Sequence, residues 1–191
     1  MSKLKLAVVV GHNVRSQGAV RRDTGETEFS YNSRLADMIV NSGKDVGIDV
    51  NIFIRTAGLG YTREIRKVYK EVDAWGADLS MELHFNSAAA TSAGGTETLS
   101  SGSKNSLIFA EEIQEQLLQA MGRINRGIKV RNSRTKGRGY MSLVAGRAPA
   151  VIVEPFFGSN AADLKATDQE SEMEEIARAL IFATIDTEKR I

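Results

Sequence analysis

The sequence contains no cysteine among its 191 residues. This absence excludes disulfide bonds, thiolate nucleophiles and sulfur-ligated zinc. Any metal site in the chain must therefore use nitrogen and oxygen ligands. Histidine is also scarce, because the chain has only two, His12 and His84.

The chain also lacks a large net charge and a long hydrophobic run. Its 25 Lys and Arg residues against 24 Asp and Glu residues give a formal charge of +1, so no overall field attracts nucleic acid or a membrane. The apolar run 4–10 is too short for a membrane helix and is followed by Gly-His rather than by a small-residue cleavage site. We therefore expect no signal peptide and no membrane insertion, and we expect the protein to be made in the cytoplasm.

What the chain does contain is an alternation of short apolar runs and amphipathic segments. This pattern predicts strands and helices in turn, and hence an α/β three-layer sandwich with a mainly parallel sheet and helices on both faces. The length fits a single domain over residues 1–191. The expected strands are 4–10, 50–54, 77–83, 96–99 and 150–153, and the expected helices are 28–44, 63–75, 104–121 and 169–184.

Three of the predicted strands end at a residue that can do chemistry. The first is followed by Gly11 and His12, the third ends at His84, and the last ends at Glu154. In open α/β sheets, ligands bind outside the carboxyl ends of parallel strands. We therefore predict that the two imidazoles and the carboxylate share one site, a metal centre with a catalytic base.

Glu28 is the acid best placed to complete the ligand set. The apolar stripe of the first helix contains Leu35 and Ile39, and stepping back along the same face reaches Asn32 and Glu28. A catalytic zinc site uses three protein ligands and keeps one position open. Two imidazoles and the Glu28 carboxylate would supply those ligands for one zinc ion per chain.

Glu154 then remains for a different task. At the mouth of an apolar strand its charged form is poorly solvated, which raises the pKa and suits a general base. Each residue also has a structural explanation by itself: a hydrogen-bonded strand-end histidine, a carboxylate favoured by the helix dipole, or a capped strand end. The coincidence of all four favours the shared site.

Five segments of the sequence form an ordered set that covers nearly the whole chain: Val10–His12, Glu28–Asn32, Asp78–Ser87, Gly95–Glu97 and Pro149–Asn160. In these segments and in their order, the chain resembles the zinc-dependent N-acetylmuramoyl-L-alanine amidases of the amidase-3 type, which hydrolyse peptidoglycan in bacteria and in phage lysins. One position departs from the family pattern, because Glu82 stands in a strand that is normally apolar or small there.

The resemblance implies that His12, Glu28 and His84 bind zinc and that Glu154 is the catalytic carboxylate. The implied reaction is hydrolysis of the amide between the lactyl group of N-acetylmuramic acid and L-alanine. Asn86 is a candidate for orienting ligands or substrate.

Glu97 is a second candidate for such an orienting role, or else an exposed strand charge. The segment 122–153 contains basic residues and no acidic ones. It is either a solvated face or a surface at which Arg131, Arg134 or Arg138 holds the carboxylates of the stem peptide. Nucleic-acid binding is less favoured, because Tyr140 is the one aromatic residue among these cations that could stack on a base.

Other functions use the same residues. A zinc peptidase that cuts within the stem peptide would need the same four side chains, and a non-catalytic wall-binding module would keep the fold. The expected partner is peptidoglycan, and we expect a monomer without nucleic-acid binding. The absence of a signal peptide suits a single-domain, endolysin-like enzyme that reaches the wall after phage or host-cell lysis.

Overall fold

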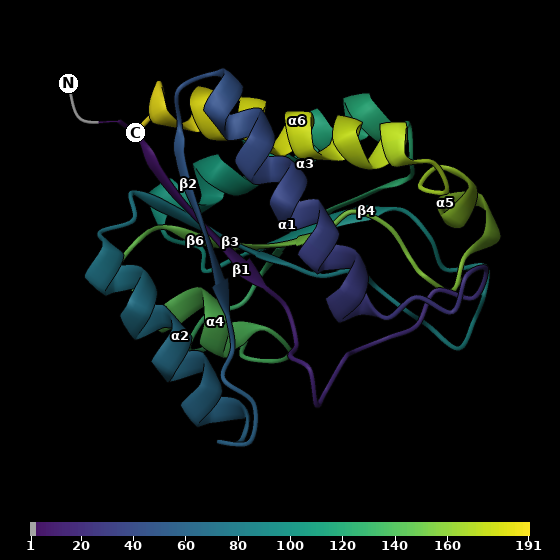
Figure 1. The fold of residues 1–191 in the computed structure, drawn as a ribbon, viewed down its shortest axis with the longest axis horizontal. Coiled ribbons are helices and arrows are strands. Elements are labelled where there is room, and N and C mark those ends of the chain that lie inside the picture. The colour runs from purple at the N-terminus through teal and green to yellow at the C-terminus, as the bar shows by residue number, and fades with distance from the viewer. Residues whose placement is uncertain (1–2) are drawn as a thin grey trace.

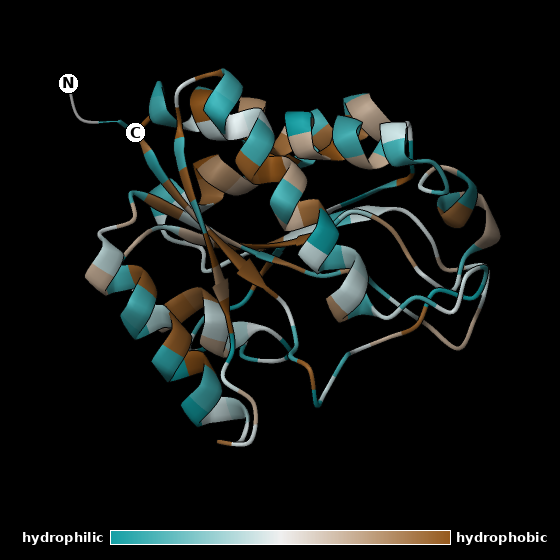
Figure 2. Cartoon of the chain, viewed as in Figure 1, coloured by the Kyte–Doolittle hydropathy of each residue, from teal (hydrophilic) through white to brown (hydrophobic). Residues whose placement is uncertain are grey.

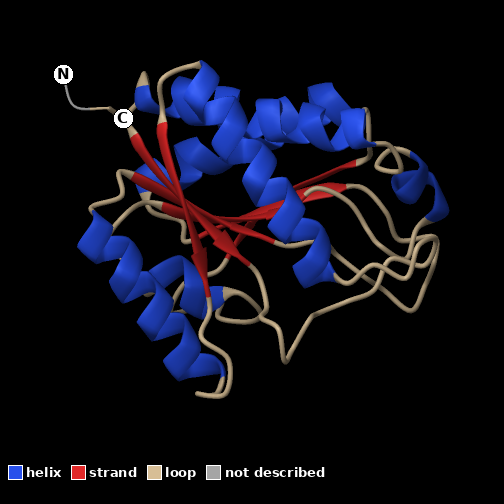
Figure 3. Cartoon of the chain, in the orientation of Figure 1, coloured by secondary structure: helices blue, strands red, loops and turns tan. Residues whose placement is uncertain are grey.

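A mixed sheet of six strands forms the middle layer of the computed structural model, which describes residues 3–191 (Figures 1 and 3). Met1 and Ser2, which begin the segment considered above for a signal peptide, lie outside the described residues. The strands are β1 (Lys5–Val10), β2 (Asp49–Ile54), β3 (Leu79–Leu83), β4 (Thr96–Ser100), β5 (Asn125–Val130) and β6 (Ala150–Glu154).

The strand order is β2-β1-β3-β6-β4-β5. Strands β2, β1, β3 and β6 run parallel to one another. β4 pairs antiparallel with β6, and β5 pairs parallel with β4. The four parallel strands therefore end at one edge of the sheet, and β4 begins there.

Helices cover both faces of this sheet. α1 (Glu28–Asp45), α3 (Lys104–Met121) and α6 (Glu170–Glu188) lie on one face, and α2 (Tyr61–Trp75) and α4 (Tyr140–Val144) lie on the other, as Figure 1 shows. α5 (Ala161–Lys165) follows the loop after β6. Among residues 3–191, no helix combines the length and the apolar character that crossing a bilayer requires.

Burial on both faces explains the nearly continuous apolar character of the inner strands. In β1, Val8 and Val10 pack under α1, α3 and α6, whereas Val9 faces α2. In β3, Met81 and Leu83 join the larger cluster. The strands are accordingly mostly brown at the centre of Figure 2, whereas the helices alternate between teal and brown along their length.

The predicted fold class is confirmed: the protein is an α/β three-layer sandwich with a mostly parallel sheet. The expected strands and helices all form, with ends displaced by up to four residues. The sequence analysis did not predict β5 or α4. β5 is an edge strand rich in charge, without clean alternation, and α4 has only five residues, too few for a periodic pattern.

A buried aspartate fixes the loops that surround the carboxyl ends of β3 and β6. Asp163 has no exposed surface, and its carboxylate accepts hydrogen bonds from the backbone N–H groups of Gly95 (2.7 Å) and Phe157 (2.9 Å) and from Nε of Arg123 (2.8 Å). Removing this acceptor would leave buried donors without a partner.

We expect Asp163→Ala to lower the free energy of unfolding by about 3 kcal/mol, because each unsatisfied buried donor costs about 1–3 kcal/mol. Chemical denaturation of the metal-free protein measures this change. Asp37→Ala, at an exposed position of α1, is the control and should change the free energy by less than about 0.5 kcal/mol. Equal effects of the two substitutions would contradict the assigned role of Asp163.

Candidate metal centre and catalytic carboxylate

The register of the sheet brings the carboxyl ends of three neighbouring strands level with one another. Val10 of β1 pairs with Leu83 of β3, and Leu83 pairs with Val153 of β6. His84 directly follows β3, and Glu154 is the last residue of β6. The backbone N–H of His84 donates a hydrogen bond to the carbonyl oxygen of Val153 at 3.0 Å. The strand pairing itself therefore sets these two side chains side by side.

His12 reaches the same place through a sharp turn of the chain after β1. Its φ is +68°, a left-handed conformation that is uncommon for a residue with a side chain. The turn is fixed on both sides. The N–H of Gly11 donates to the carbonyl oxygen of Leu83 at 3.0 Å, and Nε of the buried Arg55 donates to the carbonyl oxygen of His12 at 3.0 Å.

The third member of the cluster is Glu28, the first residue of α1. The helix begins there because the Thr27 side chain caps it by accepting a hydrogen bond from the N–H of Ser30. The buried Glu28 carboxylate accepts hydrogen bonds from the N–H groups of Ala19 (2.9 Å) and Phe85 (3.2 Å). These bonds point the carboxylate toward the sheet edge rather than toward solvent.

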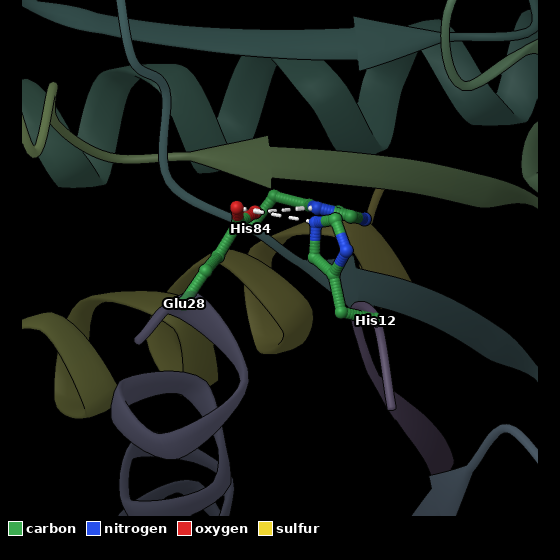
Figure 4. Close-up of side chains that lie close together, drawn as sticks. All are labelled: His12, Glu28 and His84. Carbon is green, nitrogen blue, oxygen red and sulfur yellow. Dashed lines mark hydrogen bonds and ion pairs between the residues drawn. The ribbon is translucent and has the colours of Figure 1, made fainter. Parts of the chain in front are cut away.

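Both imidazoles direct a nitrogen at this carboxylate, as Figure 4 shows. His84 Nδ1 lies 2.7 Å from Glu28 Oε1, and His12 Nε2 lies 3.1 Å from Glu28 Oε2. One potential ligand atom of each residue lies within 4.8 Å of the other two. The three residues therefore form a cluster that can hold one metal ion.

The electrostatics of the cluster favour a positive charge at its centre. Burial alone would raise the pKa of Glu28, but the hydrogen bonds from His12 and His84 hold it well below its usual value. Burial alone would lower the pKa of His84, but hydrogen bonds to Glu28 and Glu82 raise it to about 10. Without a metal, the cluster therefore binds a proton firmly at His84.

Glu154 lines the same cavity, which has a volume of about 640 Å³ and also includes the three cluster residues. The side chain is buried, and burial raises the pKa of Glu154 above its usual value, against the positive charges of His84 and Arg138. A carboxylate whose pKa is raised in this way suits general acid–base chemistry.

Arg138 connects Glu154 to the other predicted site residues. Its Nη2 donates to Glu154 Oε1 (3.0 Å) and to Asn86 Oδ1 (2.9 Å). Asn86 in turn donates through Nδ2 to Glu97 Oε1 (2.9 Å), and Glu97 also pairs with Arg126. Glu97 is thus partly buried within a polar network rather than exposed on its strand.

The three predicted arginines have different positions. Arg138 lines the cavity, whereas Arg131 and Arg134 lie in the loop after β5 and do not. A role of Arg131 or Arg134 in holding substrate stays a prediction. The sequence analysis missed Arg55, for which the sequence offers no signal, and the contact of Glu82 with His84, although it noted Glu82 as an unusual charge inside a strand.

Two imidazoles and a carboxylate, with a second carboxylate in the same cavity, form a set of side chains typical of metal-dependent hydrolases. Comparison with known sequences agrees with this class. The sequence profile of the N-acetylmuramoyl-L-alanine amidases, Amidase_3, matches residues 6–185, so the chain belongs to this family.

Individual relatives support the assignment. The chain is 27% identical over 178 residues to the N-acetylmuramoyl-L-alanine amidase LytC of Bacillus subtilis (strain 168). The match covers 92% of this chain but 34% of LytC, so the chain spans about a third of that protein's length.

Solved structures have the same fold. The catalytic domain of the CD27L endolysin, which targets Clostridia difficile, superposes with a TM-score of 0.79 at 26% identity, covering 95% of this chain and 97% of that one. The catalytic domain of CwlV from Bacillus (Paenibacillus) polymyxa var. colistinus superposes with a TM-score of 0.77 at 20% identity, covering 98% and 99%.

The absence of a side chain at Gly18 leaves room for the cluster. A Cβ there would lie 2.5 Å from Glu28 Oε2 and 2.6 Å from His12 Cδ2, and the φ of Gly18 is +78°. Gly25 is a matched control, because its φ is +75° and a Cβ would meet nothing within 4 Å.

We expect Gly25→Ala to cost about 1–2 kcal/mol through backbone strain alone. Gly18→Ala should cost more, since it adds a clash with Glu28 and His12. In NMR spectra, the resonances of both imidazole rings should shift in Gly18→Ala, and neither should shift in Gly25→Ala. Identical spectra and stabilities for the two variants would contradict the close packing of the cluster around Gly18.

Proposed function

We propose that this protein is a zinc-dependent amidase that hydrolyses the bond between the lactyl group of N-acetylmuramic acid and L-alanine in peptidoglycan. The observation that carries the proposal is the convergence of His12, Glu28 and His84 beside Glu154, in a chain that belongs to the amidase family. Residues from four separate elements meet in one cavity, and together they have the chemistry that this reaction requires.

The residues present fit a zinc ion. Two imidazole nitrogens and a carboxylate oxygen are ligands that zinc accepts, and three protein ligands are usual where a position stays open for water or substrate. The backbone N–H groups of Ala19 and Phe85 orient the Glu28 carboxylate, and Gly18 leaves the space around it clear. His12, Glu28 and His84 would therefore hold the ion.

When bound, zinc supplies Lewis acidity toward the carbonyl oxygen of the amide and makes water a stronger nucleophile. Glu154 accepts a proton from the attacking water and later donates it to the nitrogen of the leaving L-alanine. Its burial prepares it for both steps, because a raised pKa lets one carboxyl group act first as a base and then as an acid. The products are a glycan strand and a free stem peptide.

The polar groups around Glu154 have supporting roles. Asn86, which donates a hydrogen bond to Glu97, accepts one from Arg138 and so helps to hold the guanidinium group beside Glu154. The side chain of Arg138 is 71% exposed although its tip contacts Glu154. Arg138 can therefore bind a carboxylate of the stem peptide by a charge-assisted hydrogen bond.

We propose that this one domain acts on the wall in the manner of an endolysin.

Analysis of the reaction products tests the proposed bond. Purified muropeptides incubated with the protein should yield intact stem peptides with a free L-alanine amine, detected by mass spectrometry, and a chelator should stop their release. Fragments cut within the stem peptide would indicate the peptidase instead. Undiminished release in the presence of the chelator would contradict the metal dependence.

Two substitutions separate metal binding from proton transfer. Glu154→Gln should retain zinc and lose at least about 100-fold in kcat, because general acid–base catalysis contributes 10²–10⁴-fold. His84→Ala should lose both zinc and turnover. Zinc content by elemental analysis and turnover by muropeptide release measure the two properties. Unchanged turnover in Glu154→Gln would remove the role assigned to Glu154.

The pH profile tests the contact between Arg138 and Glu154. The positive charge of Arg138 lowers the pKa of Glu154, opposing burial, so Arg138→Gln should raise that pKa further. Because the base acts in its ionised form, the acidic limb of kcat/KM should move to higher pH. Arg147→Gln, at a residue that pairs with Asp73 outside the cavity, is the control. A shift to lower pH in Arg138→Gln would contradict the assignment.

A further inference from the structure

Glu82 is a charged residue in the interior of a buried strand. It is 1% exposed and lies in β3, two residues before His84. Burying an isolated carboxylate is costly, so such a residue persists only where specific partners compensate the charge. The proposed reaction assigns no task to Glu82, and its partners therefore indicate its role.

The carboxylate of Glu82 contacts His84 and Tyr69 directly, and the hydroxyl group of Ser142 also stabilises its charge. Oε1 lies 2.9 Å from Nε2 of His84, and Oε2 accepts a hydrogen bond from the hydroxyl group of Tyr69 at 3.1 Å. Tyr69 lies in α2 and is buried, with 1% of its surface exposed. The buried Arg55 lines the same cavity and adds a positive charge nearby.

The position of Glu82 relative to the imidazole distinguishes it from a ligand. His84 presents Nδ1 to Glu28 and Nε2 to Glu82, and these two ring nitrogens point in divergent directions. An ion held by Nδ1 among His12, Glu28 and His84 would therefore lie on the side of the ring away from Glu82. An ionised carboxylate only accepts hydrogen bonds, so Nε2 must carry the proton in this contact.

We propose that Glu82 is a positioning residue for the metal centre, which orients His84, keeps its proton on Nε2 and leaves Nδ1 to the metal. This inference rests on the zinc site of the proposed function. A carboxylate that accepts the second N–H of a ligand histidine fixes the ring and makes the ligand nitrogen more basic. Tyr69 holds Glu82 in this orientation from the adjacent helix.

The charge balance gives a second reason for Glu82. A divalent ion with Glu28 and two neutral imidazoles leaves one positive charge in a buried site. Arg55 adds a further positive charge beside it, and the Glu82 carboxylate would offset one of these charges without occupying a coordination position. Replacing Glu82 by an uncharged residue should therefore weaken zinc binding even where the imidazole stays in place.

Zinc affinity tests the proposal independently of amidase activity. The metal-free protein is titrated with zinc in competition with a chromogenic chelator. Glu82→Leu should raise the zinc Kd by roughly 100-fold and Glu82→Gln by roughly 10-fold, because outer partners of ligand histidines typically contribute 10–100-fold. Glutamine keeps an acceptor for Nε2 and should rescue part of the loss. Glu26→Gln, which removes an acid paired with Arg34 away from the cluster, should leave the Kd unchanged.

A second variant and a spectroscopic measurement keep the test decisive if Glu82 variants fail to fold. Tyr69→Phe keeps the ring and should raise the Kd less than Glu82→Gln does. NMR of the zinc-loaded wild type should show His84 protonated on Nε2. Zinc coordination through Nε2 of His84, or an unchanged Kd in Glu82→Leu, would overturn the proposal.

The outcomes also separate this inference from the proposed function. If the wild type binds zinc and releases stem peptides while Glu82→Leu keeps the same Kd, only the role of Glu82 falls. If the wild type binds zinc and Glu82→Leu weakens it but no stem peptide is released, the role of Glu82 stands and the amidase proposal falls. If the wild type binds no zinc, both fall.

Discussion

The parallel pairing of β1, β3 and β6 is the constraint on which the rest of the structure depends. Because these strands are neighbours in register, the chain must leave the sheet three times at one edge. A side chain of the candidate site stands at each of these exits, so the backbone hydrogen bonds of the sheet fix the spacing of the site. The helices bury both faces and thereby keep the strands in that register.

Charge compensation is the second theme of the molecule. Two buried carboxylates, Glu28 and Glu82, contact opposite nitrogens of His84, and both are surrounded by donors. A site of this kind stabilises positive charge, as a proton or as a metal ion. Glu154 has a different surrounding, because burial outweighs the positive charges near it and its pKa is raised. One cavity thus holds carboxylates whose surroundings favour a bound positive charge and a carboxylate whose surroundings favour its protonated form.

Much of this arrangement was predictable from the sequence. The apolar runs before His12, His84 and Glu154 predicted strands buried on both faces, and parallel strands bring their ends together. The helical stripe of α1 placed Glu28 inward. β5 and the antiparallel direction of β4 were not predictable, since no local pattern encodes strand order. Nor could the sequence show that Glu82 contacts His84, because strand twist and the histidine rotamer determine that contact.

We propose that one metal ion binds among His12, Glu28 and His84, and a crystal of the zinc-loaded protein tests this most directly. Diffraction data collected on both sides of the zinc absorption edge locate the metal without reference to activity. We expect one anomalous peak per chain, about 2.0–2.1 Å from a nitrogen of each histidine and at a similar distance from a Glu28 oxygen. A zinc peak elsewhere, or none in the cavity at saturating zinc, would contradict it.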